Sequence, residues 1–233
     1  MNKNRVSIMW PTYIGEFYNP NHLEIKKPLL DFFTQYKNLN KNSRSGGTVL
    51  SPTDKSSEDK YEINDDVYMS KYDLHLQKNE SYQKLMKFTS DAIMAIVTQA
   101  TKTELKSLDF EEKNLTTLIK ESWFIDYKKG GFVLPHTHPQ CSWNCVYYVQ
   151  LGDDVSAING STFFQKTRPP SQTNDFGSEY NTNTMLKIKP IEGKLLVWPQ
   201  FVMHGSTPYY ARLKSPNRII VSVNALVTNK KIN

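Results

Sequence analysis

The half of the chain that begins near residue 115 consists of short β-forming runs separated by turn signals. Several short strands at roughly 8–12-residue spacing are typical of a β-sandwich or barrel. This half therefore predicts a β core over residues 115–228. The runs are rich in valine, isoleucine, leucine and aromatic residues, and they cover residues 122–127, 143–150, 161–165, 185–188, 194–197 and 218–227.

Two helices are predicted before the β core. Apolar residues recur at helical spacing from His22 to Tyr36, where Pro28 limits the start of the helix or kinks it. The same spacing recurs from Asn79, a plausible cap, to about Thr101. Helices that precede a run of strands indicate a mainly β, α+β fold in which the helices brace one sheet.

Two long segments lack a helix or strand pattern. Lys37–Asp59 and Thr167–Thr184 are rich in asparagine, serine and threonine and contain proline, so both are predicted to be loops. Function concentrates on long loops over a rigid scaffold, and we expect both to be lids over a pocket. We expect one domain over residues 1–233, in which residues 1–114 hold an N-terminal strand, the helices and a loop.

Charge and hydropathy limit the setting of the protein. The chain has 233 residues, a formal net charge of +6 and a sequence pI of about 9.1. This balance weakly favours an anionic partner or substrate; nucleic acid stays open, although no basic and aromatic stripe marks a nucleic-acid surface. No apolar run approaches the ~18 residues of a membrane helix, and the N-terminus lacks the apolar core of a secretory signal.

Cys141 and Cys145 are predicted to be free thiols. On one extended segment their Cα atoms lie ~13 Å apart, beyond the ~7 Å that a disulfide tolerates. A lone Cys-x3-Cys is also not a zinc ribbon. Free thiols indicate a reducing compartment, and we expect a cytoplasmic protein in which both cysteines fill a strand face.

Three of the five histidines are candidates for one metal site. His136 and His138 follow an apolar run, and side chains two residues apart on an extended segment point to the same side, ~6.6 Å apart at the backbone. His204, expected in a loop after a strand, is the third. Imidazole suits iron, zinc, copper and nickel alike, so the ligand type does not choose the metal. Without His204, the pair could equally be exposed loop histidines; His22 and His75 are assigned no role.

Arg218 opens the last β-forming run. On a strand it shares one face with Ile220, Ser222 and Asn224. A polar face inside a barrel is costly unless something binds there, and a guanidinium matches a carboxylate bidentately. The sequence leaves open whether this face lines the interior or lies outside in solvent.

Tyr127 and one phenol of the Tyr147-Tyr148 pair are candidates for the same interior. Tyr147 and Tyr148 present one phenol to each face of their strand, and Tyr127 precedes the first histidine by one short turn. A buried tyrosine needs a partner for its hydroxyl. A carboxylate held by Arg218 is one such partner for Tyr148, and a plain core role is the alternative.

Together these positions resemble the iron(II)/2-oxoglutarate-dependent oxygenases. The chain looks closest to the group of them found in bacteria and phages, and is more remotely similar to the prolyl hydroxylases. The resemblance covers roughly residues 121–226. It is carried by Tyr127, Gly130-Gly131-Phe132, His136-x-His138, Val146-Tyr147-Tyr148-Val149, Pro190, Gly193-Lys194-Leu195-Leu196-Val197-Trp198-Pro199, His204-Gly205 and Arg218-Ile219-Ile220-Val221-Ser222-Val223-Asn224.

The resemblance implies a double-stranded β-helix, a jelly-roll or cupin-like core, with a metal at its mouth. It implies that His136 and His204 ligate iron(II), and that Arg218 forms a salt bridge with the distal carboxylate of 2-oxoglutarate. Tyr148 and Tyr127 match tyrosines that line the pocket of that co-substrate. The implied reaction hydroxylates a C–H bond of an unidentified substrate and releases succinate and CO2.

His138 departs from the family pattern. Most members have Asp or Glu at this position, which completes a facial triad of two histidines and one carboxylate. The next acidic residues here, Asp153 and Asp154, follow a full strand later. Three neutral histidines leave the site one positive charge higher than the usual triad, and an incoming dianion would offset it. We expect His138 to ligate directly; contact through water and loss of activity are the alternatives.

Two other functions stay open from the sequence. One is a cupin-like metalloenzyme that uses the three histidines without 2-oxoglutarate, and the other is a non-enzymatic jelly-roll that only binds. Jelly-rolls host all three functions, so the fold alone does not choose.

Overall fold

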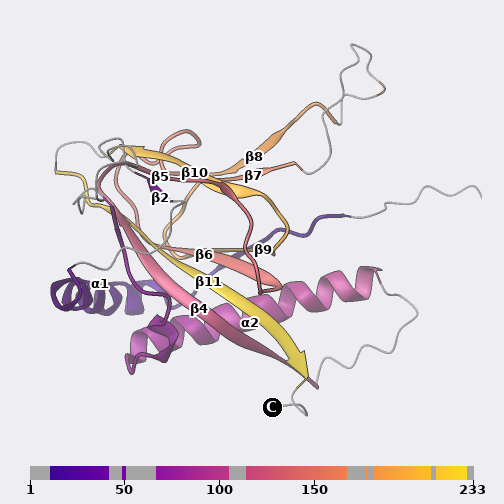
Figure 1. Cartoon of the computed structure of the whole chain (residues 1–233), viewed down its shortest axis with the longest axis horizontal. Coiled ribbons are helices and arrows are strands. Elements are labelled where there is room, and N and C mark those ends of the chain that lie inside the picture. The colour runs from indigo at the N-terminus through magenta and orange to yellow at the C-terminus, as the bar shows by residue number, and fades with distance from the viewer. Residues whose placement is uncertain are drawn as a thin grey trace, which may run out of the picture.

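The computed structural model describes residues 11–41, 49–50, 67–104, 114–166, 177, 181–210 and 214–229. Within them, two antiparallel sheets face each other (Figure 1). Six strands form one sheet, in the order β1 (Gly15–Tyr18), β9 (Lys194–Pro199), β6 (Trp143–Gln150), β11 (Arg218–Asn229), β4 (Leu115–Tyr127) and β3 (Val67–Met69). Five strands form the other, in the order β2 (Val49–Leu50), β5 (Lys129–His136), β10 (His204–Tyr210), β7 (Thr162–Gln165) and β8 (Met185–Ile188).

Neighbouring strands come from distant parts of the chain. In the six-stranded sheet β11 lies between β4 and β6, and in the other sheet β10 lies between β5 and β7. Two facing antiparallel sheets interleaved in this way form a double-stranded β-helix, so the predicted fold class is confirmed. The sequence did not predict β2, β3, β5 or β10 as strands. The expectation that His204 lies in a loop was wrong, because this residue opens β10.

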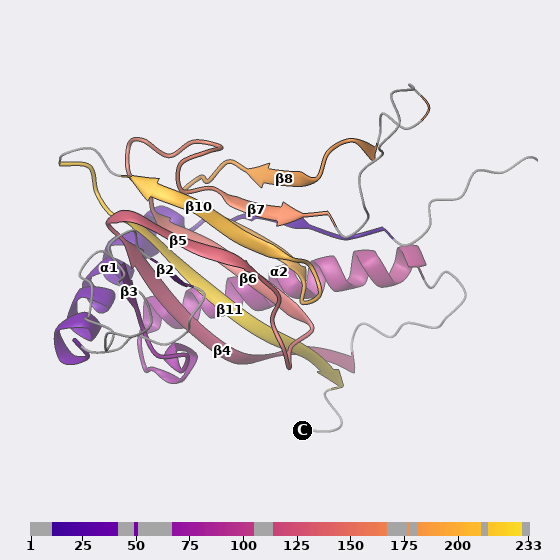
Figure 2. The same cartoon turned by 45° about the horizontal axis from the view of Figure 1, so that its top comes forward.

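Two helices cover the outer face of the six-stranded sheet, as predicted. Helix α1 spans His22–Leu39 and helix α2 spans Glu80–Glu104, and Figure 2 shows both on the side of that sheet away from β5 and β10. A short 3-10 helix, η1 (Leu74–Leu76), precedes α2. The two helices and the outward side chains of β4, β6, β9 and β11 share one apolar cluster.

Aromatic packing joins α1 to the sheet. Phe33 of α1 is buried and stacks on Phe124 of β4, with ring centroids 4.3 Å apart. Tyr82 of α2 lies edge-on to Phe33 at 6.2 Å, and its hydroxyl donates to Ser122 Oγ at 2.8 Å. Each such side chain contributes about 1.5–3 kcal/mol by burial, so this cluster fixes the helices on the sheet.

The two helix starts differ. The Tyr82 N–H donates to Asn79 Oδ1 at 3.0 Å, so the predicted cap of α2 is confirmed. The side chain of Asn21, which precedes α1, makes no such bond, and Asn19 Oδ1 instead accepts from the Asn21 N–H. Pro28 lies inside α1 rather than at its start.

The alternation along β11 decides which way its polar face points. Ile219, Val221 and Val223 belong to the cluster under the helices. The opposite face, which begins with Arg218 and ends with Asn224, therefore lies between the two sheets. Arg218 is only 1% exposed, so the polar face of β11 lines the interior and does not lie in solvent.

Most of the two expected lid segments lies outside the described residues. The start of Lys37–Asp59 belongs to α1, which runs to Leu39, and its residues 49–50 form β2, which pairs with β5. Of Thr167–Thr184, residues 177 and 181–184 are described. No helix of the described part is long and apolar enough to cross a membrane.

Candidate metal centre

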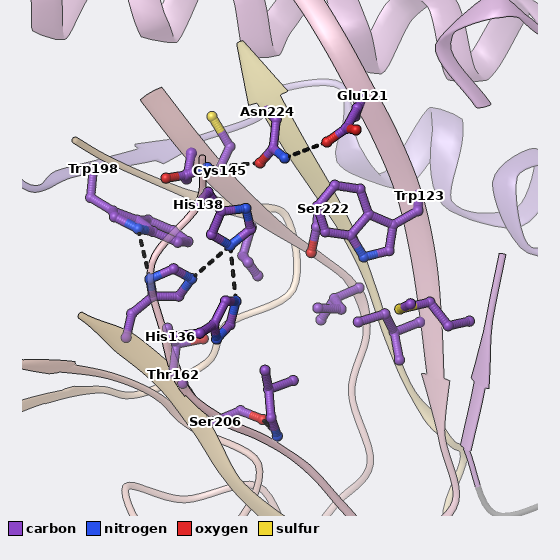
Figure 3. Close-up of a pocket in the computed structure, with 18 of the residues that line it drawn as sticks. Glu121, Trp123, His136, His138, Cys145, Thr162, Trp198, Ser206, Ser222 and Asn224 are labelled. Atoms are coloured by element: carbon purple, nitrogen blue, oxygen red, sulfur yellow. Dashed lines mark hydrogen bonds between the residues drawn. The ribbon is translucent and has the colours of Figure 1, made fainter. Parts of the chain in front are cut away.

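A cavity of about 310 Å³ lies between the two sheets. Its walls come from β3, β4, β6, β9 and β11 on one side and from β5, β7 and β10 on the other. Figure 3 shows the side chains that line it. The three candidate histidines and Arg218 all line it. The structure therefore brings together residues that are up to 82 positions apart, between His136 and Arg218 in the sequence.

Strand register explains why His136 and His204 meet. They are the last residue of β5 and the first residue of β10, and they lie directly opposite one another in the sheet. His138 follows two residues later, and its backbone N–H donates to the Gln200 carbonyl at 3.4 Å. A Cβ added to Gly205 would lie 2.7 Å from the Val133 carbonyl oxygen, so glycine permits the close strand approach beside His204.

The three imidazoles converge through the same atom. Nε2 of His138 lies 2.9 Å from Nε2 of His136 and 3.2 Å from Nε2 of His204 (Figure 3). One ligand atom from each of the three residues lies within 4.8 Å of the others. His204 is 5% exposed, and the other two are half-buried. The predicted grouping of these histidines is present in the structure.

Backbone carbonyls set the ring tautomers of two of them. His136 Nδ1 lies 2.7 Å from the Leu134 carbonyl, and His204 Nδ1 lies 2.9 Å from the Val202 carbonyl. A carbonyl only accepts, so each Nδ1 carries the proton and each Nε2 presents a lone pair. The indole N–H of Trp198 also lies 3.2 Å from His204 Nδ1. Because Nδ1 donates its proton to the nearer Val202 carbonyl, it cannot also accept a hydrogen bond from this indole.

Burial keeps all three rings neutral. It lowers the pKa of His204 to about 3 and the pKa of His138 to about 4, and in both the neighbouring His136 lowers the pKa further. Burial also lowers the pKa of His136 itself. Neutral imidazole is the form that binds a metal, so the cluster is ready to ligate at neutral pH.

The nitrogen spacing fits a metal ion. For metal–nitrogen bonds of ~2.1 Å, ligands at right angles lie ~3.0 Å apart and tetrahedral ligands lie ~3.4 Å apart. The distances from His138 Nε2 to the other two Nε2 atoms, 2.9 and 3.2 Å, bracket the right-angle value. Three lone pairs this close repel one another without a cation. The three histidines therefore fit a metal ion that they bind from one side, with coordination positions on its other side left for other ligands.

Arg218 occupies another part of the cavity wall. Its guanidinium carbon lies 4.6 Å from the ring centroid of Tyr127 and 5.8 Å from that of Tyr148. Nε and Nη1 have no hydrogen-bond partner among the described residues, although both atoms are buried. A buried cation without an anionic partner is costly, so this end of the cavity is built for an anion.

Tyr127 and Tyr148 flank the guanidinium, and both are fully buried. The Tyr148 hydroxyl donates to Thr162 Oγ1 at 2.7 Å, so a partner within the protein satisfies it. Tyr147 points to the opposite face, as expected, where its hydroxyl lies 2.8 Å from His22 Nδ1. His22, which was assigned no role from the sequence, therefore joins α1 to the sheet.

Cys141 and Cys145 are buried free thiols, as predicted. Cys145 lines the cavity, and burial raises the pKa of its thiol. The thiol is therefore protonated at neutral pH, and its side chain belongs to the apolar cluster under the helices.

A polar row that was not predicted from the sequence lies at the end of the cavity away from Arg218. Glu121 on β4, Asn224 on β11 and Asn144 on β6 are directly opposite one another on three adjacent strands. Glu121 could have been found from the alternation of side chains along residues 121–127, because this alternation puts it on the same face of the strand as Tyr127. Figure 3 shows Glu121 and Asn224 joined above His138.

Comparisons with known proteins agree with this geometry. A family model described as "Putative 2OG-Fe(II) oxygenase" matches residues 121–224, somewhat less than half of the chain but all of the candidate site. A search of curated protein sequences finds no match.

Solved structures share the fold at low sequence identity. A prolyl hydroxylase from Trichoplax adhaerens, in complex with a hypoxia inducible factor peptide fragment, is 11% identical with a TM-score of 0.51. The match covers 91% of this chain and 82% of that one. HygX from Streptomyces hygroscopicus, with nickel, 2-oxoglutarate and hygromycin B bound, is 11% identical with a TM-score of 0.52, over 92% of this chain and 82% of that one.

The family match and the three-histidine cavity identify the same part of the chain. The family's named cofactors are iron(II) and 2-oxoglutarate. Residues 121–224, which carry the three histidines and much of the two facing sheets, are therefore similar to the 2OG-Fe(II) oxygenase family.

Proposed function

We propose that the protein is an iron(II)- and 2-oxoglutarate-dependent dioxygenase in which His136, His138 and His204 hold the metal and Arg218 binds the far carboxylate of 2-oxoglutarate. The observation that carries the proposal is the pairing, in one cavity, of three convergent Nε2 atoms with a buried guanidinium that has unpartnered N–H groups. When bound, iron(II) and 2-oxoglutarate supply the oxygen chemistry that releases succinate and CO2 and hydroxylates a substrate C–H bond.

The three histidines would hold the ion as neutral donors. Each Nε2 faces the common centre, and the Nδ1 protons of His136 and His204 are engaged by carbonyls. Without a protein carboxylate among the ligands, the site keeps the full double charge of the ion. This extra positive charge favours an anionic co-substrate over neutral ligands.

Arg218 and its neighbours would orient the co-substrate. The guanidinium fork offers two unpartnered N–H groups from a rigid central strand, which suits a bidentate carboxylate. Tyr127 and Tyr148 exclude water from its two sides, which strengthens this ion pair. The Tyr148–Thr162 hydroxyl pair lies at the same end as a further polar contact for the carboxylate.

The cavity also has room for a substrate beyond the metal. On the far side of the histidines from Arg218 it is lined by Trp123, Tyr72 and the polar row at Glu121. We infer that the unidentified substrate enters there. We further propose a single domain for residues 1–233 and a cytoplasmic setting, supported by the shared helix–sheet cluster and the two free thiols.

The unpartnered Arg218 favours this function over its alternatives. A three-histidine metalloenzyme without 2-oxoglutarate has no need of a buried cation in the same cavity. A non-enzymatic jelly-roll has no need of three imidazoles with convergent lone pairs. Both features together are what a metal-chelating dianion requires.

The test is metal analysis combined with a 2-oxoglutarate titration under anaerobic conditions. We expect about one iron(II) per chain, and calorimetric binding of 2-oxoglutarate that depends on both the metal and Arg218. His75→Ala, which alters a histidine outside the cavity, is the matched control and should retain both. Iron binding without 2-oxoglutarate binding would favour the cupin-like metalloenzyme, and absence of both would favour the binding module.

A further inference from the structure

The polar row at Glu121 contacts the one candidate ligand whose ring orientation no backbone carbonyl sets. Asn224 Nδ2 donates to Glu121 Oε2 at 2.7 Å, and Asn144 Nδ2 donates to Asn224 Oδ1 at 2.7 Å. The Asn224 amide also lies close to the His138 ring and favours the protonated form of that ring, as a hydrogen-bond acceptor does. Figure 3 shows the second ring nitrogen of His138 turned toward Asn224.

Glu121 fixes the orientation of the Asn224 amide. A carboxylate only accepts hydrogen bonds, so Asn224 must turn its NH2 group toward Glu121. If the amide were reversed, its oxygen would face a carboxylate oxygen at 2.7 Å. Asn224 Oδ1 therefore faces His138 and Asn144. Asn144 donates a hydrogen bond to this oxygen.

The orientation of Asn224 in turn fixes the tautomer of His138. An amide oxygen only accepts, so His138 must donate from Nδ1. Its Nε2 is then unprotonated and presents a lone pair to the Nε2 atoms of His136 and His204, which lie 2.9 and 3.2 Å away. The three rings reach the same tautomer by different means: two through backbone carbonyls, and His138 through two side chains.

We propose that Glu121 and Asn224 form a positioning relay that holds His138 as an Nδ1–H tautomer and lends carboxylate character to this ligand. The inference rests on the proposed function, because it requires His138 to be a metal ligand. A hydrogen bond from a ligating imidazole to a carboxylate, or to a group that a carboxylate polarises, raises its basicity toward the metal. The negative charge that a protein carboxylate ligand would supply is thus provided by Glu121, with Asn224 and His138 between it and the ion.

The fold holds the relay rigidly. Glu121, Asn224 and Asn144 lie opposite one another on β4, β11 and β6, the three central strands between β3 and β9. Asn144 is fully buried and Asn224 is 5% exposed. The pairing of β4 with β11 shifts by one residue directly after Asn224, and this β-bulge ends the row. Lys120 is the extra residue of β4 at the bulge. Bulges beside functional sites re-aim side chains, and this one ends the inward face of β4 at Glu121.

Three variants separate the charge from the hydrogen bonds. Glu121→Gln can donate as well as accept, so Asn224 is free to reverse and His138 should populate both tautomers. Combining Glu121→Gln with Asn224→Asp restores an acceptor-only group beside His138, to which the introduced glutamine amide donates, and returns one negative charge. Asn224→Leu removes the acceptor altogether. Ser222→Ala, on the same face of β11, is the matched control.

The first measurement is the nitrogen-15 spectrum of histidine side chains in the metal-free protein. We expect His138 to be protonated at Nδ1 alone in the wild type, in Ser222→Ala and in the double variant. We expect mixed protonation in Glu121→Gln and in Asn224→Leu. Protonation of His138 at Nε2 in the wild type, or a wild-type signal in both single variants, would overturn the relay.

The second measurement is the Kd for Co(II), by chelator competition. Asn224→Leu should weaken binding roughly 10- to 100-fold, which is the range for partners of metal-ligating histidines. Glu121→Gln should weaken it about 10-fold, and the double variant should return to within about 3-fold of the wild type. A folded double variant that stays as weak as Glu121→Gln overturns the relay. A wild type that binds no metal overturns the proposed function instead, and the tautomer pattern separates the two failures.

Discussion

His136 and His204 lie directly opposite each other across two antiparallel strands, as the last residue of β5 and the first residue of β10. Their ring centroids are 4.4 Å apart. Because these two strand ends pair in register, the sheet itself holds the two imidazoles side by side, and no loop is needed to bring them together. The third histidine needs only to turn back from the short segment after β5, which explains how a His-x-His and a distant histidine form one cluster.

The first prediction concerns His138 as a direct ligand. His138→Ala should lower iron(II) affinity by at least about 10-fold, because it removes one of three nitrogen donors. Iron stoichiometry after anaerobic loading measures this, with His75→Ala as the control. Iron binding that is unchanged in His138→Ala would remove this residue from the ligand set.

The second prediction separates the metal from the co-substrate. Arg218→Leu should retain iron(II), but should weaken 2-oxoglutarate binding by about 1.5–3 kcal/mol, roughly 10- to 150-fold, because charge-assisted bonds to the carboxylate are lost. Calorimetric titration of the iron-loaded protein measures it. An unchanged 2-oxoglutarate Kd would show that Arg218 faces another ligand.

The same substitution makes a prediction about stability. Arg218 is buried with two unpartnered nitrogen atoms, so Arg218→Leu removes an uncompensated buried charge from the metal-free, ligand-free protein. We expect its free energy of unfolding to be equal to or higher than that of the wild type, measured by urea titration. A loss of several kcal/mol would mean that the guanidinium has a partner within the protein.

The fourth prediction is a pH dependence of the stability of the metal-free protein. The pKa values of His138 and His204 are lowered to about 4 and about 3 by burial, so the unfolded chain takes up protons at higher pH than the folded chain does. Stability should be fully present above about pH 6.5 and should fall as the pH drops through 4 toward 3. Urea midpoints across this range measure it. His204→Gln should flatten the slope, and a slope as steep as that of the wild type would contradict the assignment.

The fifth prediction tests the packing of helix α1 against the sheet. Phe33 is buried against Phe124, so Phe33→Ala should lower the free energy of unfolding by about 3–5 kcal/mol. Phe201, which is 52% exposed, is the matched control, and Phe201→Ala should change stability by less than about 0.5 kcal/mol. Equal effects at the two positions would show that α1 does not depend on this contact.

Local patterns in the sequence determined much of the fold. Helical spacing located α1 and α2, and β6 begins at Trp143 and ends at Gln150 as predicted. These elements follow from periodicity and propensity, which act over a few residues. β10 escaped prediction because its sequence, from His204 to Tyr210, contains glycine and proline and has little apolar alternation, so pairing with β5 and β7 decides its conformation.

The sequence by itself determined which residues could carry the chemistry: the three histidines, Arg218 and the flanking tyrosines. Only the tertiary structure decided that the polar face of β11 points inward, because a strand has two faces and nothing within it says which one a second sheet will cover. Only the tertiary structure brought Glu121 beside Asn224, because a hydrogen bond between side chains 103 positions apart depends on strand register. Register is a property of the sheet, and it is set when β4, β6 and β11 pair.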